Sequence, residues 1–186
     1  PTLLLKHTKD VDTTKLLLQL NADPNPTTNY GYTPLHLASR FGQVDIARLL
    51  LQFKANPNTK NKDGETPLHI GSRFGQMETV RLLLQFKADP NTKNKYGNTP
   101  LHWASIHGQV DTARLLLQFK VDPNTKNKNG STPLHLASLR GRVDTVRLLL
   151  QSKADPNPKN KYGNTPNHWT DNHEIKQLLE PSMQIE

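Results

Sequence analysis

The chain has 186 residues, a formal net charge of +8 and a pI of about 9.7. It contains no cysteine, which excludes disulfides and thiolate metal sites. It also has no apolar run of membrane-spanning length, and residues 1–20 lack a signal-peptide pattern. We therefore expect a soluble intracellular protein, cytoplasmic or nuclear. Only 33% of the residues are hydrophobic, which would favour disorder unless those residues are regularly spaced.

A tetrapeptide supplies that regular spacing. Thr-Pro-Leu-His begins at Thr33, Thr66, Thr99 and Thr132, and a degraded copy begins at Thr165, each 33 residues after the last. A fixed period of this length indicates a stack of similar supersecondary units. One such unit has too few apolar side chains to offset the entropy lost on ordering its backbone, so the units must stack to fold.

Each unit is predicted to contain two helices and a polar loop. Thr33 is a favourable N-cap and Pro34 a favourable first helical residue, while Gly42 suits the left-handed turn that ends the helix. A second helix is predicted from Val44 to Leu51. The loop that follows, 55–64, is rich in turn-forming residues and leads into the next tetrapeptide. We call this loop, together with the residue just before the tetrapeptide (Glu65 in this copy), and its equivalents the fingers.

The fourth residue of the tetrapeptide is a histidine in every copy. Its side chain is short enough to hydrogen-bond within its own turn or to the neighbouring finger. Adjacent helices pack about 10 Å apart, which is too far for two such imidazoles to share a metal. We therefore expect structural histidines, and neither a metal nor a cofactor. The positions are His36, His69, His102, His135 and His168.

Four motifs recur in a fixed order: Gly-x-Thr-Pro-Leu-His-x-Ala, Gly-Gln-Val-Asp, Leu-Leu-Leu and Ala-Asp-Pro-Asn. At this spacing the sequence resembles the ankyrin repeat family over nearly its whole length. The resemblance implies an all-α repeat solenoid of antiparallel helix pairs, with β-hairpin fingers projecting to one side. It also implies a curved array whose concave groove binds proteins.

The array is predicted to be a single domain spanning 1–186. A partial N-terminal capping repeat would occupy 1–27, full repeats 28–60, 61–93, 94–126 and 127–159, and a truncated C-terminal capping repeat 160–186. The full copies depart from the family after the second helix, where lysine replaces the common glycine. Lysine favours the helix dipole but is unfavourable in a left-handed conformation, and either conformation is open. These residues are Lys54, Lys87, Lys120 and Lys153.

The residues that vary between copies are the candidates for partner recognition. They lie on the fingers and near the ends of the first helices, positions that line the groove in the resembled family. Aromatic residues and arginine are typical of binding hot spots, although here the aromatic side chains could instead pack finger against helix. The set comprises Tyr30, Tyr32, Arg40, Phe41, Asp63, Glu65, Arg73, Phe74, Tyr96, Asn98, Ile106, His107, Leu139, Arg140 and Tyr162.

Two further rows repeat along the chain. Phe53, Phe86 and Phe119 follow the second helices, and Ser152 breaks their row; packing between repeats is favoured over a binding strip. The second row is a basic ladder of two lysines per finger. A solvated face is the simplest reading of this ladder, and an acidic partner, nucleic acid or a membrane surface are the alternatives. The ladder comprises Lys60, Lys62, Lys93, Lys95, Lys126, Lys128, Lys159 and Lys161.

Catalytic motifs are missing from the sequence: there is no nucleophile elbow, phosphate-binding glycine loop or HExxH. We expect a non-enzymatic, monomeric module that binds another protein, whose identity the sequence does not give and which could be acidic. One alternative is a basic scaffold for nucleic acid or anionic lipid. Another is an engineered, consensus-like array without a natural ligand.

Overall fold

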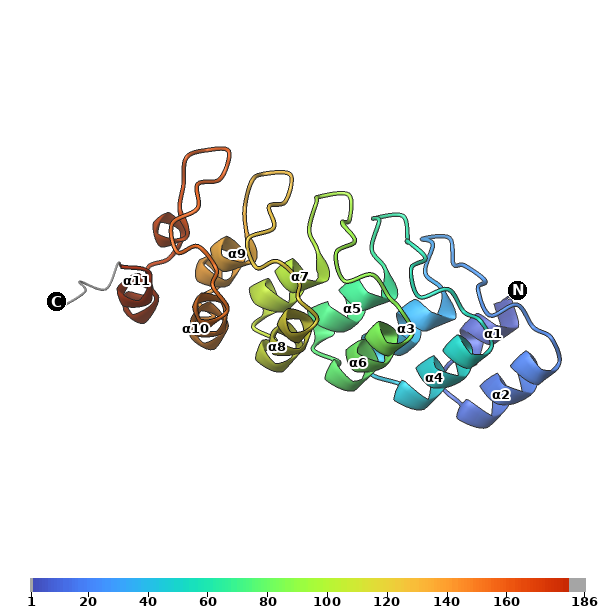
Figure 1. Cartoon of the computed structure of the whole chain (residues 1–186). Coiled ribbons are helices and arrows are strands. Elements are labelled where there is room, and N and C mark those ends of the chain that lie inside the picture. The colour runs from blue at the N-terminus through green and yellow to red at the C-terminus, as the bar shows by residue number, and fades with distance from the viewer. Residues whose placement is uncertain (1, 181–186) are drawn as a thin grey trace.

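The computed structural model describes residues 2–180, and these form one stack of helix pairs. Residues 2–6 and 173–179 lie at opposite ends of the stack, and the fingers project from one side (Figure 1). No helix within residues 2–180 is long and apolar enough to cross a bilayer. The helices are α1 (Thr2–Lys6), α2 (Val11–Gln19), α3 (Pro34–Phe41), α4 (Val44–Gln52), α5 (Pro67–Phe74), α6 (Met77–Gln85), α7 (Pro100–His107), α8 (Val110–Gln118), α9 (Pro133–Leu139), α10 (Val143–Gln151), the 3-10 helix η1 (Pro166–Trp169) and α11 (His173–Leu179).

The tetrapeptide starts each first helix as predicted. Thr33 has an extended backbone, its Oγ1 accepts a hydrogen bond from the amide of His36 at 3.3 Å, and its own amide donates to His36 Nδ1 at 3.1 Å. These reciprocal bonds satisfy two backbone donors that a helix start leaves free. The helix ends at Gly42, whose φ of 65° is left-handed. The same threonine and histidine bonds recur in α5, α7 and α9.

Each of these histidines also joins its unit to the next one. His36 Nε2 lies 3.0 Å from the carbonyl oxygen of Glu65, 29 residues later, and His102 Nε2 lies 3.1 Å from that of Ser131. Because Nδ1 accepts from the threonine amide, the ring is neutral and Nε2–H donates to the next finger. Burial lowers the pKa of His36, His69 and His102 from 6.5 to about 4, which keeps this tautomer at neutral pH. Both bonding modes expected of these histidines are therefore present at once.

A single hydrophobic core runs through the stack. Leu35 and Leu50 are fully buried, and so are their equivalents in the next three units. At the C-terminal end Asn167 takes the place of the core leucine and is exposed, and the first helix of that unit shrinks to the short η1. Ile175 and Leu179 of α11 close the core at this end. The units therefore share one core, as stacking requires.

The lysines after the second helices are left-handed. Their φ angles are 67° at Lys54, 64° at Lys87, 59° at Lys120 and 65° at Lys153. A residue with a Cβ pays about 1–2 kcal/mol in this conformation, so each full unit carries one strained residue. The strain allows the chain to turn back, because the amide of Ala55 then reaches the carbonyl oxygen of Leu50 at 2.8 Å.

The fingers are stacked turns. No residue from 2 to 180 is in a β-strand, so the fingers expected as β-hairpins lack strands. Within one finger, the amide of Asn61 bonds the carbonyl of Glu65 and the amide of Gly64 bonds the carbonyl of Asn61, both at 2.9 Å. Between fingers, the amide of Lys62 bonds the carbonyl of Tyr30 at 3.0 Å. The backbone groups that a strand ladder would use are thus paired within these turns and with the next finger.

Candidate functional site

The candidate partner-binding residues lie on two adjoining parts of each unit. Tyr30, Asp63, Tyr96 and Tyr162 lie on the fingers, and the others lie just before the tetrapeptides or near the ends of α3, α5, α7 and α9. Figure 1 shows the fingers projecting beyond these first helices, on the side away from the second helices. We call this surface the inner face, and the surface formed by α4, α6, α8 and α10 the outer face.

Large aromatic side chains are exposed along the inner face. Tyr30, Tyr96 and Tyr162 are 73%, 62% and 71% exposed, and they occupy every second finger. Phe41 and Phe74, at the ends of α3 and α5, are 58% and 40% exposed. Tyr32 is only partly exposed, since its ring packs edge-on against His36. Apart from Tyr32, the aromatic rings named here thus leave much of their surface free, rather than packing fully between finger and helix.

Arg40 is held among these rings. Its guanidinium carbon lies 5.1 Å from the ring centre of Phe74 and 5.6 Å from that of Phe41, within the range of a cation–π interaction. No acidic group within residues 2–180 lies within 4.0 Å of Arg40. The side chain is exposed, so its charge is oriented by the rings and free to meet a carboxylate.

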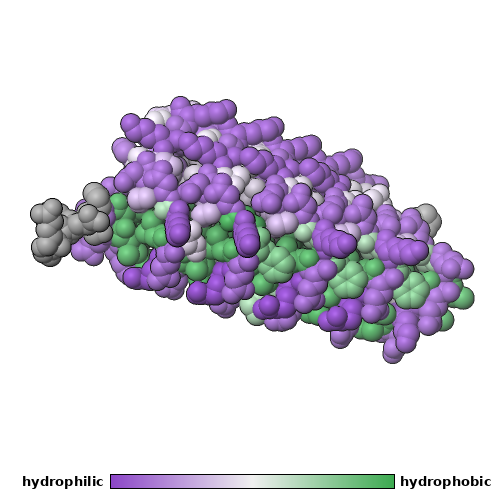
Figure 2. Space-filling view, in the orientation of Figure 1, coloured by the Kyte–Doolittle hydropathy of each residue, from purple (hydrophilic) through white to green (hydrophobic). Residues whose placement is uncertain are grey.

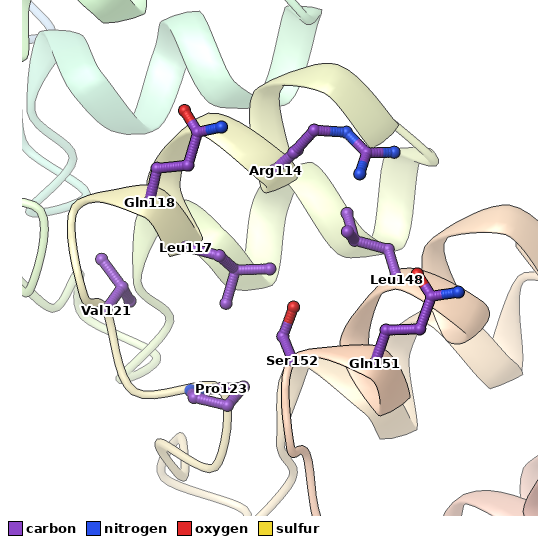
Figure 3. A pocket seen from close by; sticks show the side chains of 8 residues that line it. All are labelled: Arg114, Leu117, Gln118, Val121, Pro123, Leu148, Gln151 and Ser152. Atoms are coloured by element: carbon purple, nitrogen blue, oxygen red, sulfur yellow. The ribbon is translucent and has the colours of Figure 1, made fainter.

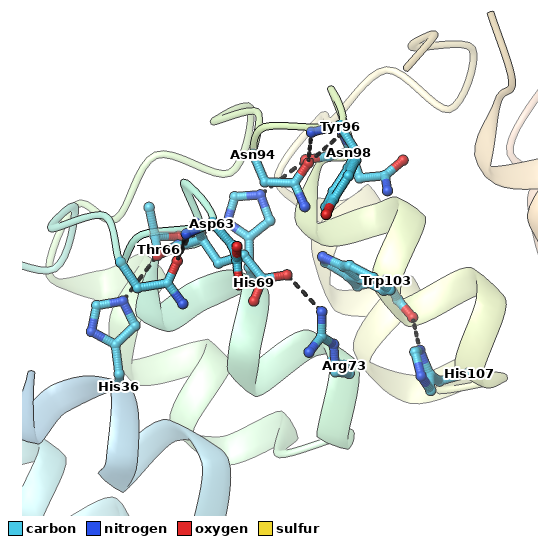
Figure 4. A network of polar contacts seen from close by, with 12 residues as sticks. His36, Asp63, Thr66, His69, Arg73, Asn94, Tyr96, Asn98, Trp103 and His107 are labelled. Atoms are coloured by element: carbon cyan, nitrogen blue, oxygen red, sulfur yellow. Dashed lines mark hydrogen bonds and ion pairs between the residues drawn. The ribbon is translucent and has the colours of Figure 1, made fainter. Parts of the chain in front are cut away.

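The centre of the inner face contains an ion pair between the buried Glu65 and the partly exposed Arg73 (Figure 4). Glu65 comes from a finger and is 3% exposed, and its Oε1 accepts a hydrogen bond from Arg73 Nη2 at 2.6 Å. The guanidinium carbon of Arg73 lies 3.9 Å from the ring centre of Trp103, in the next unit. Burial raises the pKa of Glu65, and the charge of Arg73 opposes this rise. Glu65 therefore anchors Arg73 instead of facing solvent.

Asn98 and His107 complete this central group. The amides of Tyr96 and Asn98 donate to Asn94 Oδ1 at 2.9 and 3.0 Å, which shapes the finger. Asn98 is partly buried, and its Oδ1 accepts from Asn127 Nδ2 at 2.9 Å. His107 is exposed, and its Nδ1–H donates to the carbonyl of Trp103 at 3.0 Å. Burial lowers the pKa of His107. Tyr96 and His107 thus remain on the surface, whereas Asn98 mainly supports the finger.

Three further inner-face candidates lie at the ends of α7 and α9. Ile106 is partly buried near the end of α7, and Leu139 at the end of α9 is 48% exposed. Arg140 follows it and is exposed, with no acidic group within 4.0 Å in residues 2–180. The candidates therefore form a strip that crosses several units, in which Glu65 and Asn98 are the supporting members.

Sequence reasoning missed two features of this surface. The stacking of Arg73 on Trp103 could have been suspected from the sequence, because tryptophan replaces the leucine or isoleucine that holds this position in the other full units. The second feature is a brace at the helix ends. Gln76 Nε2 donates to the carbonyl of Arg40, and Gln109 Nε2 to that of Arg73, both at 3.3 Å. The periodic glutamine of the Gly-Gln-Val-Asp motif was the available sign of this brace.

The basic ladder divides into two kinds of lysine. The Nζ atoms of Lys60, Lys93 and Lys126 each donate to the carbonyl of the lysine 33 residues later, at 3.2, 2.9 and 3.1 Å. The first lysine of each of these three fingers therefore makes a hydrogen bond to the next unit. All eight lysines of the ladder are exposed, and the fingers that carry them present a hydrophilic surface (Figure 2).

A comparison with known families agrees with this architecture. A family model described as ankyrin repeats (3 copies) matches residues 51–127 and 117–184, and one described as ankyrin repeats (many copies) matches residues 16–70. The chain belongs to the ankyrin repeat family. Ankyrin repeats are generally protein–protein interaction modules without enzymatic activity. A search of curated proteins found no significant match.

Proposed function

We propose that this ankyrin repeat protein binds a protein partner across its inner face and carries out no reaction. The observation that carries the proposal is the run of exposed aromatic side chains beside oriented arginines. Tyr96 and Phe74 are large, have few rotatable bonds and lie in the middle units, where a bound segment is most desolvated. The pair of the buried Glu65 with Arg73 holds this part of the face rigid before binding, which lowers the entropy cost of association.

The partner is proposed to be acidic as well as apolar. Arg40 and Arg140 are exposed inner-face cations without an acidic group within 4.0 Å in residues 2–180, and Asp63 is the one exposed carboxylate among the candidates. Opposite charge on a partner would speed its encounter and exclude partners of like charge. Acidic side chains of the partner would contact Arg40. Apolar side chains of the partner would contact Phe74 and Tyr96.

The basic scaffold is the rival function. Its strongest element was the lysine ladder, but three of the eight Nζ groups already donate to neighbouring carbonyls. A salt series separates the two functions, because binding of a polyanion through several lysines weakens by orders of magnitude between 50 and 200 mM salt. Partner affinity that falls this steeply would favour the scaffold.

Matched variants test the inner face directly. Extract proteins captured by the wild-type chain are compared with those captured by the double variant Phe74→Ala, Tyr96→Ala and by Arg81→Ala. Arg81 lies on the outer face, where its Nε is 3.7 Å from Glu78. A specific partner should be lost by the double variant and retained by Arg81→Ala. The reverse pattern would place binding on the outer face, and no specific capture by the wild type would favour an array without a natural ligand.

A further inference from the structure

The outer face has one break in an otherwise regular row. Phe53, Phe86, Phe119 and Ser152 each follow the last residue of a second helix. Their backbone angles are closely similar, with φ between −91° and −83° and ψ between 19° and 26°. The Cβ therefore leaves the chain in the same direction in all four units. At Ser152 a hydroxyl group therefore takes the place of the phenyl ring that the other three units have at this position.

The exposure of a neighbouring leucine shows what that ring covers. Leu18, Leu51 and Leu84 each precede one of the phenylalanines by 35 residues, and they are only 2%, 6% and 7% exposed. Leu117 holds the same position relative to Ser152 and is more exposed than these three. We infer from this pattern that the ring covers a leucine of the preceding unit, and that Leu117 is more exposed because serine replaces the ring.

A cavity of about 370 Å³ lies at this point, between α8 and α10 (Figure 3). An apolar cavity of about 150 Å³ can already hold a benzene ring. The side chains of Leu117 and Ser152 point toward the space between the two helices in Figure 3. Apolar residues form one part of the lining, Leu117, Val121, Pro123 and Leu148, and polar residues form the other, Arg114, Gln118, Gln151 and Ser152. We call this cavity the outer pocket.

Arg114 gives the outer pocket a charge preference. Its equivalents on α6 and α10 are paired, Arg81 with Glu78 at 3.7 Å and Arg147 with Glu174 at 2.7 Å. No acidic group within residues 2–180 lies within 4.0 Å of Arg114, which is exposed. A guanidinium at the rim of an apolar cavity favours a ligand that combines an apolar body with a carboxylate.

We propose that the outer pocket binds an aromatic side chain of a protein partner, with a carboxylate of the same segment on Arg114. The ring would take the place that a phenylalanine of the chain itself takes in the other units, and it would cover Leu117. Because the outer pocket lies on the second helices, this site is separate from the inner face and does not depend on the function proposed there.

The test uses three small probes of such a segment: N-acetylphenylalanine, its amide and N-acetylalanine. Binding is followed by the amide chemical shifts of residues 114–123 and 148–152 in NMR titrations. N-acetylphenylalanine is expected to bind weakly but saturably at these residues. N-acetylalanine should bind at least about tenfold more weakly, because it lacks the buried ring. The amide of N-acetylphenylalanine should bind with an affinity up to about fivefold lower than the acid, as expected for the loss of an exposed ion pair.

Variants of the chain distinguish the outer pocket from general stickiness. Ser152→Phe should abolish binding and raise the melting temperature, because its ring fills the outer pocket from within. Arg114→Gln should lower the affinity for N-acetylphenylalanine to that for the amide, whereas Arg48→Gln, the same position on α4, should change nothing. The proposal would be overturned if N-acetylalanine bound as well as N-acetylphenylalanine. It would also be overturned if Ser152→Phe retained binding or had a lower melting temperature than the wild type. Self-association that Ser152→Phe abolishes would overturn it too, by assigning the outer pocket to a second copy.

Discussion

The junctions between units and the inner face follow opposite rules. At each junction between the full units the same threonine, histidine and carbonyl make the same hydrogen bonds, with distances that agree within a few tenths of an ångström. On the inner face, the side chain at one finger position is Tyr30, then Asp63, then Tyr96. Stability therefore rests on what is repeated, and recognition is proposed to rest on what varies. Changes at the junctions should mainly alter folding, and changes at exposed inner-face positions should mainly alter binding.

The largest expected effect is acid destabilisation of the junctions. A folded pKa of about 4 against 6.5 corresponds to about 3 kcal/mol for each of His36, His69 and His102. The unfolded chain binds protons that the folded chain excludes, so this stability is complete above pH 6.5 and is lost as the pH falls toward 4. Urea unfolding between pH 7.5 and 5 should show a steep decline in the free energy of unfolding. A flat profile over this range would mean that the histidines are not held neutral.

A smaller effect on stability is expected at the central ion pair. Glu65→Ala leaves Arg73 without its buried partner and should lower the free energy of unfolding by about 1–3 kcal/mol, since Arg73 keeps partial access to water. Arg147→Ala is the matched control. Its pair with Glu174 is nearly as short, 2.7 Å, but both side chains are about half exposed, so the loss should be within about 1 kcal/mol. Equal losses in thermal or urea unfolding would show that burial does not set the strength of these pairs.

Binding is expected to depend on the exposed aromatic side chains. Phe74→Ala or Tyr96→Ala should each weaken the affinity for the inner-face partner by at least about 1–2 kcal/mol, while the melting temperature changes little. Isothermal titration calorimetry of each variant measures this. Arg81→Ala should bind like the wild type. A large fall in stability without loss of affinity would assign the two rings to packing.

The smallest effect concerns the left-handed lysines. Lys87→Gly removes the strain of a Cβ at φ 64° and should raise the free energy of unfolding by about 1 kcal/mol. Lys95→Gly, on the next finger and without a positive φ, should lower it slightly, because glycine increases the entropy of the unfolded chain. Differential scanning calorimetry of the two variants compares them. A lower midpoint for Lys87→Gly would mean that this lysine makes a stabilising contact greater than its strain.

The sequence predicted the helices well because their start and end signals are local and repeated. Thr33, Pro34 and Gly42 each act within one or two turns of their own backbone. The conformation of Lys87 could not be predicted, since the dipole and the left-handed strain oppose each other with similar magnitude. The absence of strands in the fingers was missed because their backbone partners come partly from the neighbouring finger.

The inner face was predictable by position but not by role. Asp63 and Glu65 are both acidic finger residues two positions apart, and the sequence does not distinguish them. The structure exposes Asp63 and buries Glu65 against Arg73. Arg73 in turn stacks on Trp103, which lies on the next unit. The sequence of a single repeat therefore does not predict the role of a residue that contacts a neighbouring unit.

The bond from each buried histidine to the next finger also bears on how the chain can change in length. If residues 61–93 were removed, His36 would face the carbonyl of Asn98, the same group that His69 now contacts. The units brought together would then be joined by the same histidine–carbonyl hydrogen bond that joins the present units. Duplication of 33 residues would create a junction with this bond too. Gain or loss of whole units can thus reorder the side chains of the inner face and keep the hydrogen bonds between units.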